Sequence, residues 1–457
     1  MLTLCGLYVA QGIPWGFVTV TFAAWLAQPK NGLTAEEIGP ILAVATLPWS
    51  FKFLWGPLMD RFTILRFGRR RPWIIFAQSM AILVLGSMLL IEDLPGMVWT
   101  EAPESGALQR AIYSFIPGPL AGLILLANIF ISLQDVAVDA LAVDLLAEEE
   151  RGTANGLMYG SSYFGTAVGG AGLGYLVANY GIRAGLLGQA ILLSLIMLLP
   201  LLIRERPDRS SDKDVPEEDG MRPHAEVDFG ETPFLPPEDA RQSGTESIVA
   251  TESVFGNLFR AFSLRATLIG GLVAISVRIG VGVLTAVFVD YLMKGGGWQQ
   301  SEYTQITGGY AVLLGLVGSA MGGYIADKFG AKKMIAITSI LVGTLWISFG
   351  MIPASIESKA AVKFMLLSQE FLLAVMSVSL FALFMSISWP RVAATQFTAY
   401  MALMNLSTTI GSYTAGMLSS RLSILEILIV AGVLQAILVL PVLLIDPKQT
   451  RRVLGDS

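Results

Sequence analysis

Apolar residues in this chain run in blocks of about 20, and this block length constrains the fold more than any other feature. A helix of about 20 residues is long enough to cross a hydrocarbon layer about 30 Å thick. Only 14% of the 457 residues are charged, whereas about 25% are charged in an average soluble domain. The pattern therefore predicts a polytopic membrane protein built of helices.

The apolar blocks divide into twelve expected spans. The first six cover residues 3–26, 38–59, 73–91, 117–141, 153–178 and 184–203. The second six cover residues 264–293, 304–326, 334–353, 361–388, 396–418 and 424–445. We interpret the first block as a retained helix rather than a signal peptide, because it is long and lacks a basic leader.

A polar segment separates the two sets of six spans. Residues 204–255 hold 14 Asp and Glu against 6 Lys and Arg, so this segment has too little apolar surface to form a core. Four regions are therefore expected: an N-terminal six-helix bundle (1–203), a cytoplasmic, largely disordered acidic linker (204–262), a C-terminal six-helix bundle (263–446) and a cytoplasmic tail (447–457). Leu258, Phe259 and Phe262 have the spacing of a helix at a membrane interface.

The short loops predict how the chain is oriented. One side carries 13 Lys and Arg residues and the other side carries 7. Because basic loops stay in the cytoplasm, both termini and the linker are expected there. The expected location is the cell membrane, which is the inner membrane in a Gram-negative cell.

The two halves share a loop pattern between their second and third spans. A Gly is followed four residues later by Asp and then by a basic residue, and a second Gly with further basic residues comes after them. Its residues are Gly56, Asp60, Arg61, Gly68 and Arg69 in the first half, and Gly323, Asp327, Lys328 and Gly330 in the second. The pattern resembles the loop motif of the major facilitator superfamily. That resemblance implies an all-α integral membrane fold of twelve transmembrane helices in two pseudo-symmetric six-helix bundles. It also implies alternating access, with both motifs acting as a cytoplasmic gate. The alternative is that these basic residues only enforce topology.

Further motifs indicate one branch of that family. They are Tyr8-Val-Ala-Gln11-Gly12-Ile-Pro14, Lys52-Phe-Leu-Trp55-Gly56-Pro57, Gln134-Asp135-Val-Ala-Val-Asp139 and Ala394-Thr395-Gln396-Phe397. Together they resemble the branch of AmpG-type muropeptide permeases and acetyl-CoA transporters. Val281 stands where that pattern has an acid, and Phe371 stands where it has Asn. The resemblance implies a proton-coupled importer of an anhydro-muropeptide-like anion. The alternatives are a carrier of acetyl-CoA or another phosphate-bearing anion, or a non-transporting membrane assembly factor.

Span four places two carboxylates on one helical face, at Asp135 and Asp139. Two ionised carboxylates four residues apart repel, so one of them is expected to hold a proton more readily. We therefore expect Asp135 and Asp139 to carry proton coupling, with Lys52 as the partner of one of them. The alternative for Asp139 is a cap, or a pair with Lys52 or Arg151.

Arg278 in span seven and Glu370 in span ten are the remaining charges expected deep in the membrane. The resemblance implies that spans one, four, seven and ten line a central cavity. The forked donors of Arg278 suit a carboxylate or a phosphate, so we expect Arg278 and Glu370 to bind substrate, with Gln11 and Asn128 as weaker candidates. The alternative is a static salt bridge from Arg278 to Glu370 or Asp135. Asp290, near the end of span seven, is expected to be solvated.

Several classes of function are excluded by residues that the sequence lacks. Cys5 is the single cysteine and His224 the single histidine, so neither a disulfide nor a zinc site with several Cys or His ligands can form. No ATP-binding P-loop occurs. We therefore expect no enzyme activity, cofactor, metal or nucleic-acid partner. The expected partners are a small anionic solute, protons and the lipid bilayer, and the expected state is a monomer.

Overall fold

The computed structural model describes residues 1–62, 68–98, 115–145, 151–202 and 256–455. Every long element in these ranges is a helix, as apolar blocks bounded by Gly, Pro and charged turns require. The expected linker at 204–255 lies outside the described residues. Residues 256–262, which were expected to belong to that linker, are helical.

The first half contains six helical rods, several of them built from consecutive pieces. Their bounds are α1 (Leu2–Gly16) with η1 (Phe17–Phe22) and α2 (Ala23–Leu26); α3 (Ala35–Ser50) with η3 (Lys52–Leu54) and α4 (Trp55–Arg61); α5 (Arg71–Ser87) with η5 (Met88–Leu90); α7 (Pro119–Leu145); α8 (Arg151–Ala167) with η8 (Val168–Gly172) and α9 (Leu173–Tyr180); and α10 (Ile182–Leu202).

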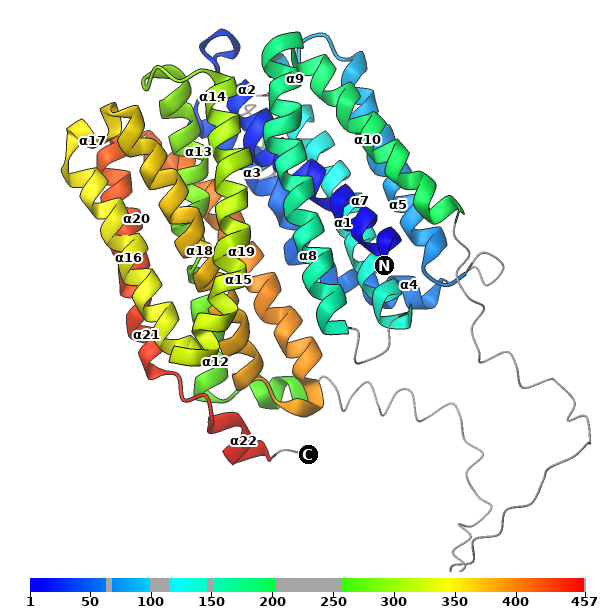
Figure 1. The fold of residues 1–457 in the computed structure, drawn as a ribbon, viewed down its shortest axis with the longest axis vertical. Coiled ribbons are helices and arrows are strands. Elements are labelled where there is room, and N and C mark those ends of the chain that lie inside the picture. The colour runs from blue at the N-terminus through cyan, green and yellow to red at the C-terminus, as the bar shows by residue number, and fades with distance from the viewer. Residues whose placement is uncertain (63–67, 99–114, 146–150, 203–255, 456–457) are drawn as a thin grey trace, which may run out of the picture.

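The second half repeats this plan. Its rods are α12 (Arg265–Ser276) with α13 (Ile279–Lys294); α14 (Gln300–Gln305) with η10 (Ile306–Tyr310) and α15 (Ala311–Phe329); α16 (Ala331–Met351); α18 (Lys359–Ile387); α19 (Ala393–Ser419); and α20 (Ile424–Ile437) with α21 (Val439–Leu444). Short helices cover the connections and the tail: η2 (Pro29–Asn31), η6 (Pro95–Met97), α17 (Pro353–Glu357), η11 (Pro390–Val392) and α22 (Gln449–Leu454). Figure 1 shows the two sets of helices side by side.

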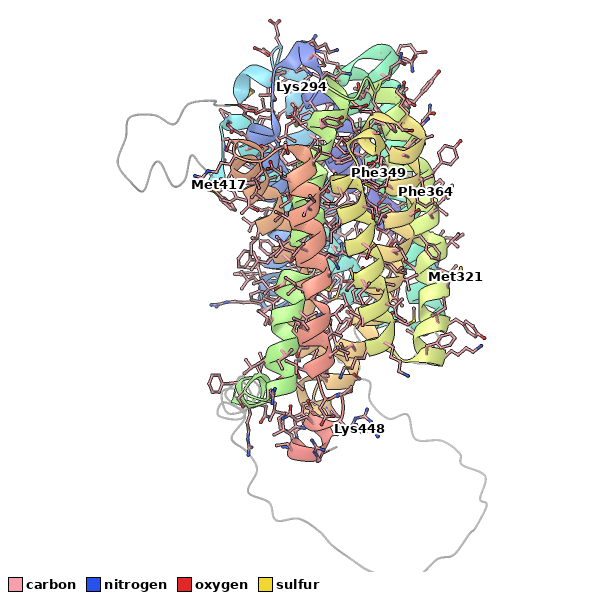
Figure 2. All side chains as sticks on the ribbon, turned by 90° about the vertical axis from the view of Figure 1, so that its left-hand side faces the viewer. Lys294, Met321, Phe349, Phe364, Met417 and Lys448 are labelled. Atoms are coloured by element: carbon pink, nitrogen blue, oxygen red, sulfur yellow. The ribbon has the colours of Figure 1, made fainter. Side chains whose placement is uncertain are left out.

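Ten helices in the described ranges are long and apolar enough to cross a membrane. The two other rods, α8 to α9 and α19, are equally long but richer in Gly, Ser and Thr. Large apolar side chains are exposed along the sides of the bundle (Figure 2), including Met321 at 46%, Phe364 at 63% and Met417 at 54%. Such a surface is stable in lipid and not in water.

Spans five and eight approach closely through two glycines. A Cβ added to Gly308 would lie 2.6 Å from Gly170 Cα, and one added to Gly170 would lie 2.7 Å from Gly308 Cα. Three π-helical turns, η1, η8 and η10, meet around this contact. It joins the two halves, because Gly170 belongs to the first and Gly308 to the second.

We expect Gly308→Ala to lower the melting temperature of the detergent-solubilised protein. The added methyl group meets backbone, and overpacking of this kind costs about 1–3 kcal/mol. Gly309→Ala is the matched control, because its Cβ would lie 3.4 Å from Ala171 Cβ, an ordinary contact. A helix gains about 1 kcal/mol from Gly→Ala, so the control should melt at or above the wild-type temperature. Equal melting of both variants would show that the Gly170–Gly308 contact is not tight.

Figure 2 places Lys294 at one end of the bundle and Lys448 at the other, and we name the ends by these residues. The halves are bound together at the Lys294 end. Lys294 Nζ donates to Leu33 O at 2.6 Å, and Ala35 N donates to Asp290 Oδ2 at 3.2 Å. Gln28 Nε2 donates to Gln300 Oε1 at 2.7 Å.

Asp290 was expected to be solvated, and that expectation is wrong. Its side chain is 21% exposed and its Oδ1 lies 2.7 Å from Lys294 Nζ. The second oxygen accepts from the first turn of α3, in the opposite half. A carboxylate is favoured at a helix N-terminus by the helix dipole, so the Asp290–Ala35 hydrogen bond fastens span seven to span two.

Among the described residues, no such fastening between the halves is found at the Lys448 end. Among hydrogen bonds and ion pairs that involve only described residues, those joining the halves lie towards the Lys294 end or near the middle of the spans, such as Asn405 Nδ2 to Trp49 O at 3.3 Å. The tail folds back on its own half instead: Gln449 Oε1 accepts from Ala266 N at 2.7 Å, and Thr450 donates to Ile387 O at 2.7 Å. The molecule is therefore closed at the Lys294 end.

Candidate substrate and proton site

Lys52 and Asp135 form an ion pair inside the first half. Lys52 Nζ lies 3.1 Å from Asp135 Oδ2, and Asp135 is 6% exposed. Pro48 lacks the N–H that would continue the ladder of α3, and the chain tightens into η3 at this point. That break directs Lys52 towards span four. Of the partners expected for Lys52, the structure selects Asp135 and not Asp139.

Asp139 has a hydroxyl partner in place of a cation. Tyr8 in span one donates a short hydrogen bond from its hydroxyl to Asp139 Oδ1. Tyr8 is 8% exposed, and its ring centroid lies 6.3 Å from that of Tyr159. The Arg151 side chain lies outside the described residues, so the expected Asp139–Arg151 alternative stays a prediction. Tyr8 was not among the expected site residues, although it stands three residues before Gln11 in the same motif.

The two uncharged candidates, Asn128 and Gln11, differ in whether their amide N–H groups have a hydrogen-bond partner. Asn128 Nδ2 donates to Ile124 O at 2.9 Å within its own helix. Gln11 is 4% exposed, and its Nε2 has no hydrogen-bond partner among the described residues. A buried donor without a partner is costly and uncommon. Gln11 is therefore the stronger candidate for a contact with solute.

Arg278 stands at a break in the middle of span seven. α12 ends at Ser276 and α13 begins at Ile279, so Arg278 precedes a helix N-terminus at membrane depth. Its backbone N–H donates to Ser407 Oγ at 2.9 Å, and its Nη2 donates to Ser377 Oγ at 3.0 Å. Discontinuous helices of this kind form substrate and ion sites in transporters. Arg278 was expected at this depth, whereas the break in the helix was not.

Glu370 does not form an ion pair with Arg278. The two side chains interact electrostatically, yet no salt bridge joins either of them to a charged group within the described ranges. Asp135 is occupied by Lys52. The expected alternative of a static bridge from Arg278 to Glu370 or Asp135 is therefore wrong for this state.

The first glycines of the two loop motifs make no close contact with the opposite half. No atom lies within 4 Å of a Cβ added to Gly56, and the nearest to Gly323 is Val378 of its own half at 3.9 Å. Asp327 and Lys328 are exposed. Gly68 and Gly330 adopt positive φ angles of 101° and 90°, which suit glycine at the turns. The Asp60 side chain lies outside the described residues, and Arg61 and Arg69 are exposed. The gate stays a prediction.

Residues 4–412 match the family model described as Major Facilitator Superfamily. The chain is similar to the anhydromuropeptide permease of Escherichia coli K12, with 29% identity over 143 residues. This match covers 31% of the chain and spans only about a quarter (24%) of that permease. An AmpG-named transporter of Rickettsia conorii is 26% identical over 336 residues, which cover 73% of this chain and 69% of that protein.

Solved transporters share the fold over almost the whole chain. A D-xylose–proton symporter superposes with a TM-score of 0.68 at 13% identity and covers 98% of this chain and 99% of its own. A nucleoside transporter superposes with a TM-score of 0.64 at 11% identity, covering 97% and 98%. These likenesses confirm the predicted all-helical architecture of two six-helix bundles.

Proposed function

The chain belongs to the Major Facilitator Superfamily of membrane transporters, and from that premise we propose that it is a secondary active transporter importing an anionic polar solute with protons. The Lys448 end carries most of the basic loop residues and is the cytoplasmic end. Closure at the Lys294 end then corresponds to the inward-facing state of an alternating-access cycle.

The observation that carries the proposal is that the two carboxylates of span four have different kinds of partner. Lys52 neutralises Asp135 directly. Among the described residues, the hydrogen-bond partner of Asp139 is the Tyr8 hydroxyl. An unpaired carboxylate charge at membrane depth is costly, and a bound proton removes that cost. Asp139 therefore carries the proton, whereas Asp135 and Lys52 hold spans two and four together.

Arg278 binds the anionic group of the solute. Ser407 fixes its backbone N–H and Ser377 binds one guanidinium nitrogen, and the remaining forked donors suit a carboxylate or a phosphate. Similarity to the E. coli permease favours an anhydro-muropeptide-like solute. Gln11 supplies a further donor, and the Asp60 and Asp327 motifs close the cytoplasmic side in the opposite state.

The test is uptake of labelled anhydro-muropeptide by proteoliposomes, with and without an inward proton gradient. Wild-type protein should accumulate the label only with the gradient. Arg278→Gln should reduce uptake about 10- to 100-fold, because a charge-assisted hydrogen bond contributes about 1.5–3 kcal/mol. Arg265→Gln, at the exposed start of the same span, is the matched control. Absence of uptake by folded wild-type protein would rule out this solute and make acetyl-CoA and other phosphate-bearing anions the next probes.

A further inference from the structure

The second half holds two opposite charges that do not neutralise each other. Arg278 is held by Ser377 and Ser407, and Glu370 has neither a hydrogen bond nor an ion pair within the part of the chain that the structure describes. The first half shows the opposite arrangement, because Lys52 and Asp135 meet at 3.1 Å. Ionisable groups at membrane depth normally pair, so this separation calls for an explanation.

Helix geometry sets how the two charges are arranged. Glu370 and Ser377 are seven residues apart on α18, which places them on one face and about 10 Å apart along the helix axis. Arg278 Nη2 binds Ser377. Glu370 therefore lies about two turns nearer the Lys294 end than the hydroxyl that holds the guanidinium.

Among the described residues, no other charged side chain interacts with Arg278 or Glu370. The groups that interact electrostatically with Arg278 are Tyr163 and Glu370, and Glu370 also interacts with Tyr303. Tyr163 is engaged with Ser319 at 3.3 Å, across the two halves. The hydrogen bonds of Arg278 and Tyr163 thus go to the uncharged hydroxyls of Ser377, Ser407 and Ser319.

A ligand with a single charge can pair with only one of the two residues, Arg278 or Glu370. A purely anionic group would bind Arg278 but would leave Glu370 without a partner and would be repelled by it. A ligand with a carboxylate and an ammonium group a few bonds apart complements both residues. It also removes the cost of leaving two charges unpaired in a low-dielectric site.

We propose that the transported solute is zwitterionic at the end that enters the second half, with Arg278 binding its carboxylate and Glu370 binding a cationic group such as an ammonium. This inference rests on the proposed function, and it narrows the solute class from anionic to one with adjacent opposite charges. Glu370 then determines specificity, whereas Asp139 carries the proton.

The test compares two labelled probes in the same proteoliposomes: an anhydro-muropeptide whose peptide bears a free amine, and the same molecule with that amine acetylated. Wild-type protein should take up the free-amine probe at least about tenfold faster at low concentration, because acetylation removes a charge-assisted contact. Glu370→Gln should lose this preference and transport the two probes equally. Glu302→Gln is the matched control, because Glu302 binds Lys359 at 2.7 Å and Lys363 at 2.8 Å at the Lys294 end.

The outcomes separate this inference from the proposed function. Equal uptake of both probes by wild-type protein would overturn the zwitterion inference and leave the importer intact. A preference that survives in Glu370→Gln would overturn the role of Glu370. Uptake of neither probe by folded wild-type protein would rule out an anhydro-muropeptide as the solute and, with it, the zwitterion inference. Continued uptake of the acetylated probe by Glu370→Gln would show that the variant is folded and that only the amine contact is lost.

Discussion

Asp139→Asn is expected to abolish accumulation of the solute against its gradient. One proton moving down a pH gradient equivalent to about 100 mV supplies about 2.3 kcal/mol, enough for a roughly fifty-fold concentration ratio. Asn cannot take up or release the proton, so the ratio should fall to about one. The measurement is the steady-state ratio of labelled solute inside and outside proteoliposomes under an imposed gradient.

Exchange of solute across the membrane should survive in Asp139→Asn. Asn keeps the shape of the side chain and resembles the protonated carboxyl, so counterflow of labelled against unlabelled solute should continue. Asp144→Asn is the control, because Asp144 is on the same helix and binds Arg70 at 3.1 Å near the Lys448 end. Full accumulation by Asp139→Asn would show that the proton is carried elsewhere, with Asp135 as the next candidate.

Lys52→Met is expected to destabilise the protein severely. The substitution leaves Asp135 charged and 6% exposed without its cation. Removing one partner of a buried ion pair costs about 3–5 kcal/mol, and we expect the lower end because the Lys52 side chain is 23% exposed. The measurement is thermal unfolding in detergent.

The double variant Lys52→Met with Asp135→Leu should recover most of the lost stability, because both charges are then removed together. Lys30→Met replaces an exposed lysine and should melt like the wild type. If the single and double variants melt equally, the ion pair does not stabilise the fold.

The span positions were predictable because membrane thickness sets the length of a spanning helix, and a run of apolar residues of that length can be recognised in the sequence. The segment expected at 264–293 is observed as Arg265–Lys294. The break beside Arg278 was not predictable, because it depends on Ser407, which accepts from the Arg278 N–H and lies 129 residues away. No local breaker as strong as proline marks this position.

The candidate site was only partly predictable for the same reason. Spacing on one helix showed that Asp135 and Asp139 share a face, but not which of them Lys52 would reach. The Tyr8–Asp139 contact joins residues 131 positions apart and depends on how spans one and four cross. The environment of Asp290 was wrongly expected because its partner, the Ala35 N–H, comes from the other half of the molecule.

The central claim is that solute and proton cross together. It is tested most directly by proteoliposomes that contain a pH-sensitive dye, with equal pH on both sides at the start. Addition of external anhydro-muropeptide should acidify the lumen in wild-type vesicles and leave it unchanged in Asp139→Asn vesicles. Entry of labelled solute into wild-type vesicles at constant internal pH would contradict proton coupling and the role assigned to Asp139.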